Sequence, residues 1–72
     1  MSEENNLKLE PHQQRVLDEK IELEDRFKKL DQFILDNPIF QSLSEEDQVL
    51  MKDQKRYMEG YLSVLEKRIS NF

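Results

Sequence analysis

The chain contains no cysteine and only one histidine, His12, among its 72 residues. It can therefore form neither a disulfide nor a thiolate metal site, and a histidine cluster is excluded as well. A chain this short buries only about 60% of its unfolded surface, and its core seldom supplies more than about 3–5 kcal/mol. Unless the monomer packs unusually well, self-association is the stabiliser that this composition leaves.

Helix breakers are scarce too, since the chain has one glycine and two prolines against 38% charged residues. Such a mixture of Glu, Lys, Leu and Arg is typical of long helices. The formal net charge is −5, and acids and bases are interspersed. Because no basic surface stands out, we expect no binding to a nucleic-acid duplex. The acidity favours solubility, and recognition of a basic protein partner is the alternative.

No apolar run approaches the roughly 20 residues that a membrane-spanning helix needs. The first six residues, Met-Ser-Glu-Glu-Asn-Asn, are polar and acidic and do not resemble a signal peptide. We therefore expect no membrane association and a location in the cytoplasm.

The residue types that catalysis needs do not come together in this sequence. His12 lies in the predicted tail or first helical turn, so no serine has a histidine base at a meaningful position. A single glycine excludes a glycine-rich phosphate loop, and the Glu-x-x-His motif of di-metal bundles is absent. The sequence predicts no enzymatic activity, no cofactor and no metal.

Apolar spacing predicts two helices, over residues of about 12–36 and about 45–70. A hinge over 37–44 joins them, because Pro38 disfavours the helical conformation in the residue before it. Ser44 is a suitable N-cap for the second helix.

The fold class that follows is all-α: an antiparallel two-helix hairpin over residues 11–72, preceded by a flexible tail over 1–10. We expect this hairpin to associate with itself into a helical bundle, most simply as a dimer with four helices, and higher oligomers are possible.

A helix that packs against a single partner needs about two apolar residues in every seven along one side. The apolar face of the first helix is wider than that, which suits two or more partners. In the hinge, Ile39, Phe40 and Leu43 are expected to plug the open end of the helix pair, with an exposed binding patch as the alternative. Gln54 is a polar residue that either sets the register of an interface or faces solvent. The residues expected in the core or at the interface between copies are Val16, Leu23, Phe27, Leu30, Ile34, Phe40, Leu50, Met58, Tyr61, Leu65 and Ile69.

The second helix contains both tyrosines and a group of cations. Guanidinium groups bind phosphates and phenol rings stack on bases, so repeats of this set at a junction between copies could enclose a small anionic ligand. The alternative is that the tyrosines lie at the edge of the core and the cations are solvated. Gly60, in the middle of this helix, either permits close approach of another backbone or a ligand, or is simply tolerated. The candidate ligand-binding residues are Arg56, Tyr57, Tyr61, Lys67 and Arg68.

The sequence resembles a family of small, mostly uncharacterised helical-hairpin proteins encoded by bacteriophages and prophages, including crAss-like phages. In the first helix and the hinge, the resemblance lies in Asp18-Glu19-Lys20-x-Glu22-Leu23-x-x-Arg26-x-x-Lys29-Leu30-x-x-Phe33-Ile34 and Phe40-x-x-Leu43. In the second helix it lies in Gln48-x-Leu50-Met51-x-x-Gln54 and Met58-x-x-Tyr61-x-x-x-Leu65-x-x-Arg68-Ile69.

This resemblance implies a small phage accessory protein in the cytoplasm of a bacterial host, without a catalytic residue to carry over. Such proteins often antagonise host defence, which leaves three hypotheses. The first is sequestration of a cyclic nucleotide immune signal in an oligomer. The second is direct inhibition of a host defence protein, as small acidic anti-CRISPR proteins do. The third is a structural or regulatory helical oligomerisation module.

Overall fold

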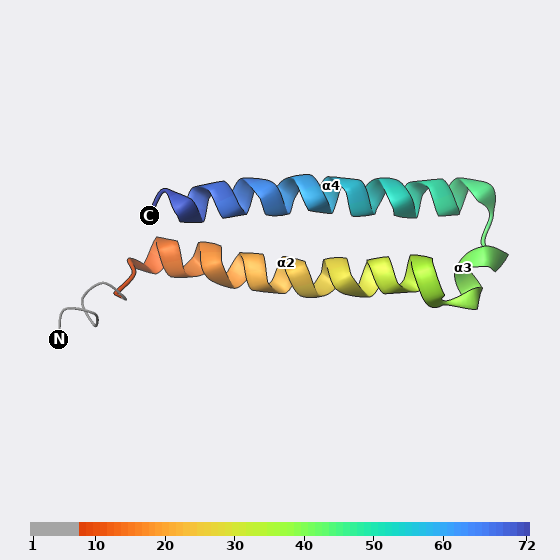
Figure 1. Cartoon of the computed structure of the whole chain (residues 1–72), viewed down its shortest axis with the longest axis horizontal. Helices are drawn as coiled ribbons and strands as arrows, with labels where there is room; N and C mark the ends of the chain where they lie inside the picture. The colour runs from red at the N-terminus through yellow and green to blue at the C-terminus, as the bar shows by residue number, and fades with distance from the viewer. Residues whose placement is uncertain (1–7) are drawn as a thin grey trace.

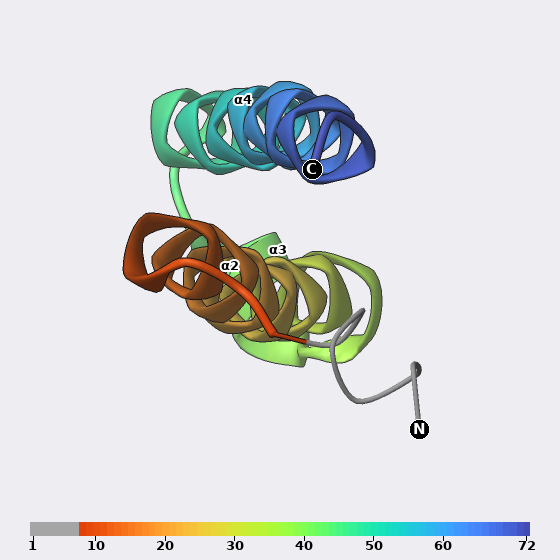
Figure 2. The same cartoon turned by 90° about the vertical axis from the view of Figure 1, so that its left-hand side faces the viewer.

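The computed structural model of the chain describes residues 8–72, which fold into a helical hairpin (Figure 1). Two long helices, α2 (Pro11–Asp36) and α4 (Glu45–Ser70), are joined by a short helix, α3 (Pro38–Ser42). The long helices run antiparallel and pack side by side, so Ser70 lies near the start of α2 (Figures 1 and 2). The all-helical fold and the packing of two long helices are confirmed. Residues 1–7 of the predicted tail lie outside the described residues.

Local sequence signals set both ends of α2. Pro11 occupies the first helical turn, where its missing N–H costs nothing. The Gln13 side chain reaches back and its Oε1 accepts a hydrogen bond from the Glu10 N–H at 2.9 Å. At the other end, Asn37 is extended, with φ −88° and ψ 121°, as expected for a residue before proline.

The hinge contains a turn of helix, α3, that the sequence analysis did not predict. Asn37 starts it, because its Oδ1 accepts the N–H of Ile39 at 2.9 Å. Phe40 is buried and meets Phe33 edge to face, with ring centroids 6.3 Å apart. Ile39, by contrast, is 58% exposed. The plug expected at this end of the hairpin is therefore made by Phe40, and Ile39 remains on the surface.

Ser44 caps α4 as predicted, its Oγ accepting the N–H of Asp47 at 3.1 Å. The first turn of α4 is acidic and its last turn contains Lys67 and Arg68. Both ends therefore complement the helix dipole, which favours anions at the N-terminus and cations at the C-terminus. The first-turn acids are Glu45, Glu46 and Asp47.

The core is one thin strip between α2 and α4. Leu65 is fully buried and forms a cluster with Val16 and Leu23, against which other apolar residues of α4 pack. Further along α2, the predicted core residues Phe27, Leu30 and Ile34 are only half-buried. The α4 residues packed against the cluster are Met58, Leu62 and Ile69. Within residues 8–72 the hairpin thus has one interior surface, and no other described segment covers its outer faces.

One ion pair links the two long helices: Lys55 Nζ lies 2.6 Å from Asp31 Oδ1. The hydrogen bond to the Asp31 carboxylate is the main cause that raises the pKa of Lys55, and partial burial opposes it. The other ion pairs of α2 lie within the helix and join Asp25 to Lys29 and Glu24 to Lys20.

The thin core makes Leu65 the most sensitive position for stability. We expect Leu65→Ala to lower the free energy of unfolding by about 2–5 kcal/mol, which is enough to abolish a cooperative melt in a domain this small. The matched control is Leu35→Ala, because Leu35 is 69% exposed on α2 and should change stability by less than about 0.5 kcal/mol. Thermal and urea unfolding followed by circular dichroism measure both. Equal losses would contradict the described core.

The Lys55–Asp31 ion pair predicts that stability falls at alkaline pH. Because the pKa of Lys55 is raised in the fold, its contribution is complete below the ordinary lysine value of about 10.4 and is lost as pH rises through the folded value. We expect Asp31→Asn to melt at a lower temperature than the parent protein at pH 8. The difference between the two melting temperatures should shrink as the pH rises through the pKa of Lys55. Asp25→Asn, which removes an exposed pair within α2, is the control and should produce no such convergence.

Candidate functional site

Helix α4 carries two parallel stripes that are offset by one residue. The inner stripe faces α2 and contains Met51, Lys55, Met58, Leu62, Leu65 and Ile69. The second stripe, which we call the outer seam, contains Leu50, Gln54, Tyr57, Tyr61, Val64 and Arg68. In both stripes the steps alternate between four and three residues, the spacing of a helix–helix seam.

The outer seam is open to solvent. Its four large apolar side chains are between 44% and 68% exposed: Leu50, Tyr57, Tyr61 and Val64. Neighbouring residues on an α-helix point about 100° apart, so two stripes offset by one residue face directions separated by about that angle. The outer seam is therefore a second helix-packing surface without a partner in the monomer. Large exposed apolar surfaces of this kind mark binding sites.

A shallow groove of about 460 Å³ lies on this surface. Two phenol rings, one amide, one carboxylate and the flexible side chain of a methionine surround it. Its lining residues all belong to α4 and are Leu50, Asp53, Gln54, Tyr57, Met58 and Tyr61. Because one helix supplies all of it, the groove has a floor and no opposing wall.

Of the predicted ligand-binding residues, Tyr57 and Tyr61 line this groove together. Arg56 lies beside them, with its Cζ 5.2 Å from the centroid of the Tyr57 ring. Lys67 and Arg68 are in the last turn of α4, and Arg68 lies seven residues beyond Tyr61, or roughly 10 Å along the axis. The structure thus brings three of the five residues together and leaves the two others farther along the helix.

Arg56 is not a free cation in the monomer. Its Nη2 lies 2.9 Å from Asp53 Oδ1, an ion pair between residues three apart on α4. The neighbouring Tyr57 phenol and then the Asp53 charge raise the pKa of Arg56, so the guanidinium stays charged. The sequence analysis missed Asp53, although its spacing of three residues from Arg56 is a recognisable signal for a pair. An anion that binds Arg56 has to compete with this carboxylate.

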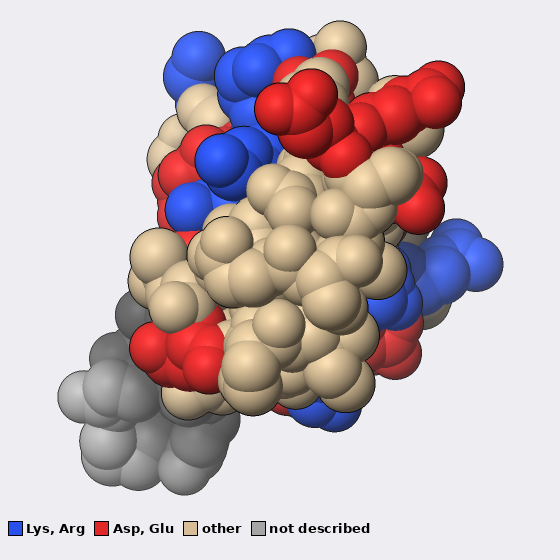
Figure 3. Space-filling view, turned by 90° about the vertical axis from the view of Figure 1, so that its right-hand side faces the viewer, with Lys and Arg blue, Asp and Glu red and all other residues tan. Residues whose placement is uncertain are grey.

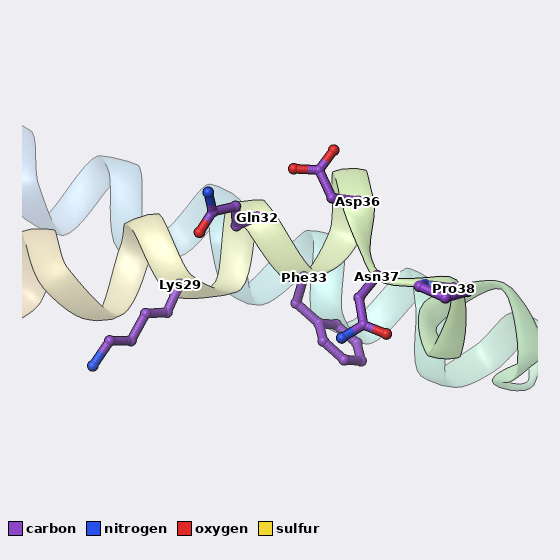
Figure 4. Close-up of a pocket in the computed structure, with 6 residues that line it drawn as sticks. All are labelled: Lys29, Gln32, Phe33, Asp36, Asn37 and Pro38. Atoms are coloured by element: carbon purple, nitrogen blue, oxygen red, sulfur yellow. The ribbon is translucent and has the colours of Figure 1, made fainter.

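A second hollow, of about 420 Å³, lies where α2 turns into α3. Figure 4 shows its lining side chains diverging: Gln32 and Asp36 point to one side of the ribbon, while Lys29 and Phe33 point to the other. Polar groups that diverge cannot bind one small molecule between them, so we do not regard this hollow as a site.

The turn end of the hairpin presents a broad uncharged surface, with acidic side chains gathered along its α4 edge (Figure 3). Ile39 contributes exposed apolar area here, and the acidic first turn of α4 begins beside it. Within residues 8–72, no three histidine or acidic side chains are grouped so that they could bind a metal ion. None of the described helices combines the length and the apolarity required to cross a bilayer.

Comparison with known proteins yields one relationship. Neither the curated proteins nor the solved structures contain a match to this chain. The sequence model of one protein family, described as Sequestin, matches residues 10–71, which include all of α2, α3 and α4. Because the match covers nearly the whole chain, the protein belongs to the Sequestin family.

Proposed function

We propose that this protein is a non-enzymatic, phage-encoded binding protein that sequesters a cyclic nucleotide immune signal in the cytoplasm of a bacterial host. The family name, Sequestin, denotes sequestration, and a sequestering protein needs a binding surface and no catalytic group. The resemblance to small phage proteins supports the role against host defence. The ligand class follows from the side chains of the outer seam.

The observation that carries this proposal is the placement of Tyr57 and Tyr61 in one groove with Arg56 against the Tyr57 ring. Phenol rings offer flat faces on which nucleobases stack, with a gain of about 1–3 kcal/mol per base. A guanidinium binds phosphate oxygens in a bidentate manner. A cyclic oligonucleotide presents both groups within a few ångströms of each other, so its chemistry matches this set.

Sequestration also requires that the ligand be enclosed, which one copy of the hairpin cannot do. The groove on α4 has no opposing wall, and small-molecule sites bury about 70–90% of their ligand. A second copy would supply the missing wall and a second set of tyrosines and cations. The thin core favours self-association independently, because small domains without disulfides or metal often gain stability that way.

Direct inhibition of a host defence protein is the second candidate, and the acidic edge of the turn end favours it. The first turn of α4 is acidic, with Glu45, Glu46 and Asp47, and acidic side chains edge an uncharged surface at this end, an arrangement that would suit a basic protein partner (Figure 3). A structural or regulatory oligomerisation module remains the third hypothesis, and it requires only that the outer seam be covered.

Isothermal titration with a panel of cyclic di- and trinucleotides tests the proposal. We expect at least one of them to bind. Tyr57→Ala and Tyr61→Ala should each weaken its affinity about 5- to 150-fold, the equivalent of one lost stacking contact. Arg56→Ala should weaken it as well. Lys29→Ala is the matched control, because Lys29 is likewise paired with an aspartate of its own helix but lies on α2.

Sequestration is contradicted if no cyclic nucleotide of the panel binds to protein that is folded and self-associated. Recovery of one stoichiometric partner from host lysate, lost on charge reversal of Glu45 and Glu46, would then support the inhibitor hypothesis in its place.

A further inference from the structure

We propose that the outer seam of α4 packs antiparallel against the outer seam of a second copy of this chain, so that two hairpins form a four-helix bundle. This inference rests on the self-association in the proposed function and adds the surface, the orientation and the register. It is independent of the identity of any ligand.

The angle between the two stripes of α4 fits this arrangement. The inner stripe faces α2, and the outer seam points about 100° away because it is offset by one residue. In a four-helix bundle each helix has two neighbours in directions that are roughly at right angles. Helix α4 therefore has α2 as one neighbour, and the outer seam is turned toward the position of the second.

The outer seam is complementary to itself when it is reversed. Its steps of four, three, four, three and four residues read the same in both directions, so a full antiparallel overlap brings every position into register. The overlap places Tyr57 beside Tyr61 of the second copy, and Gln54 beside Val64 of the second copy. At each end Leu50 packs on the aliphatic stem of Arg68 of the second copy.

The residues that flank the outer seam on its solvent side fit the same register. Asp53 lies within two residues, or about 3 Å along the axis, of the level of Lys67 of the second copy, so two pairs of opposite charge flank the interface. Gly60 lies equally close to the level of Gly60 of the second copy, next to the two-fold axis. Nothing lies within 4 Å of the position that a Cβ on Gly60 would occupy, so no packing within the chain explains a glycine there. Its missing side chain leaves space beside the two-fold axis, next to the tyrosines of both copies.

Charge selects the antiparallel orientation over the parallel one. The first turn of α4 is acidic and its last turn contains Lys67 and Arg68. Antiparallel pairing sets each acidic turn beside a basic turn and opposes the helix dipoles, which is favourable. Parallel pairing would set acidic turn against acidic turn and Asp53 against Asp53. A second copy supplies the same charge pattern in reverse, as antiparallel pairing requires.

Sedimentation equilibrium with two charge variants tests the surface. We expect the parent protein to be a dimer at micromolar concentration. Val64→Glu should weaken the dimer at least about tenfold, because the interface would then bury two unpaired carboxylates. Val49→Glu is the matched control: Val49 is 56% exposed on α4 but lies off the outer seam, so this variant should dimerise like the parent. Circular dichroism checks that both variants remain helical.

Cross-linking tests the orientation, since the chain has no cysteine of its own. With a short bis-maleimide, Gly60→Cys should give a covalent dimer in high yield. Asp53→Cys alone should not, because the two introduced thiols lie about 12 residues apart along the pair, or about 18 Å. The double variant Asp53→Cys with Lys67→Cys should cross-link again. Parallel pairing predicts instead that Asp53→Cys alone cross-links.

The outcomes separate this inference from the proposed function. The proposed interface is wrong if Val64→Glu leaves the dimer intact or if Gly60→Cys does not cross-link. In that case a cyclic nucleotide that binds in the titration would still support sequestration. A parent protein that stays monomeric at every concentration overturns the interface and the enclosed site together. A dimer with the expected cross-links that binds no cyclic nucleotide upholds the interface and overturns the ligand.

Discussion

The packing of Leu65 against Val16 and Leu23 is the contact on which the rest of the structure depends. A two-helix hairpin has one interface, and this cluster lies in the half of it that is away from the turn, so the two long helices are paired along a single strip. Each helix buries one side in that strip and exposes the others. The exposed apolar side chains of α4 are therefore a consequence of the hairpin geometry, since no third helix in residues 8–72 covers them.

Much of this fold follows from short-range sequence signals. Ser44 starts α4 and Pro38 ends α2 because each acts through its immediate neighbours. The short helix α3 escaped prediction because one turn of helix has no periodicity, and it depends on one hydrogen bond, from the Ile39 N–H to Asn37. Choosing Phe40 over Ile39 as the buried plug required knowledge of where Phe33 lies, which is a tertiary fact.

The candidate site shows a different limit of sequence reasoning. Leu50 and Tyr61 were grouped with Leu65 and Met58 as one set of core or interface residues, and the structure divides that set between two stripes. The division is hard to see in the sequence, because two stripes offset by one residue merge into one wide apolar face. Only the position of α2 shows which members of the face remain exposed, and those members define the outer seam.

The pairing of Arg56 with Asp53 gives assembly a direct effect on ligand binding. In the monomer Asp53 holds Arg56 at 2.9 Å, so the guanidinium nearest the tyrosines is already engaged by an anion. In the proposed antiparallel dimer Asp53 would also face Lys67 of the second copy, and a carboxylate shared between two cations would hold each of them less firmly. Formation of that dimer would therefore make Arg56 more available to a phosphate. Because coupling between two binding equilibria is reciprocal, an anion that binds Arg56 would also strengthen the dimer. A sequestering protein built in this way would close around its ligand as it assembles.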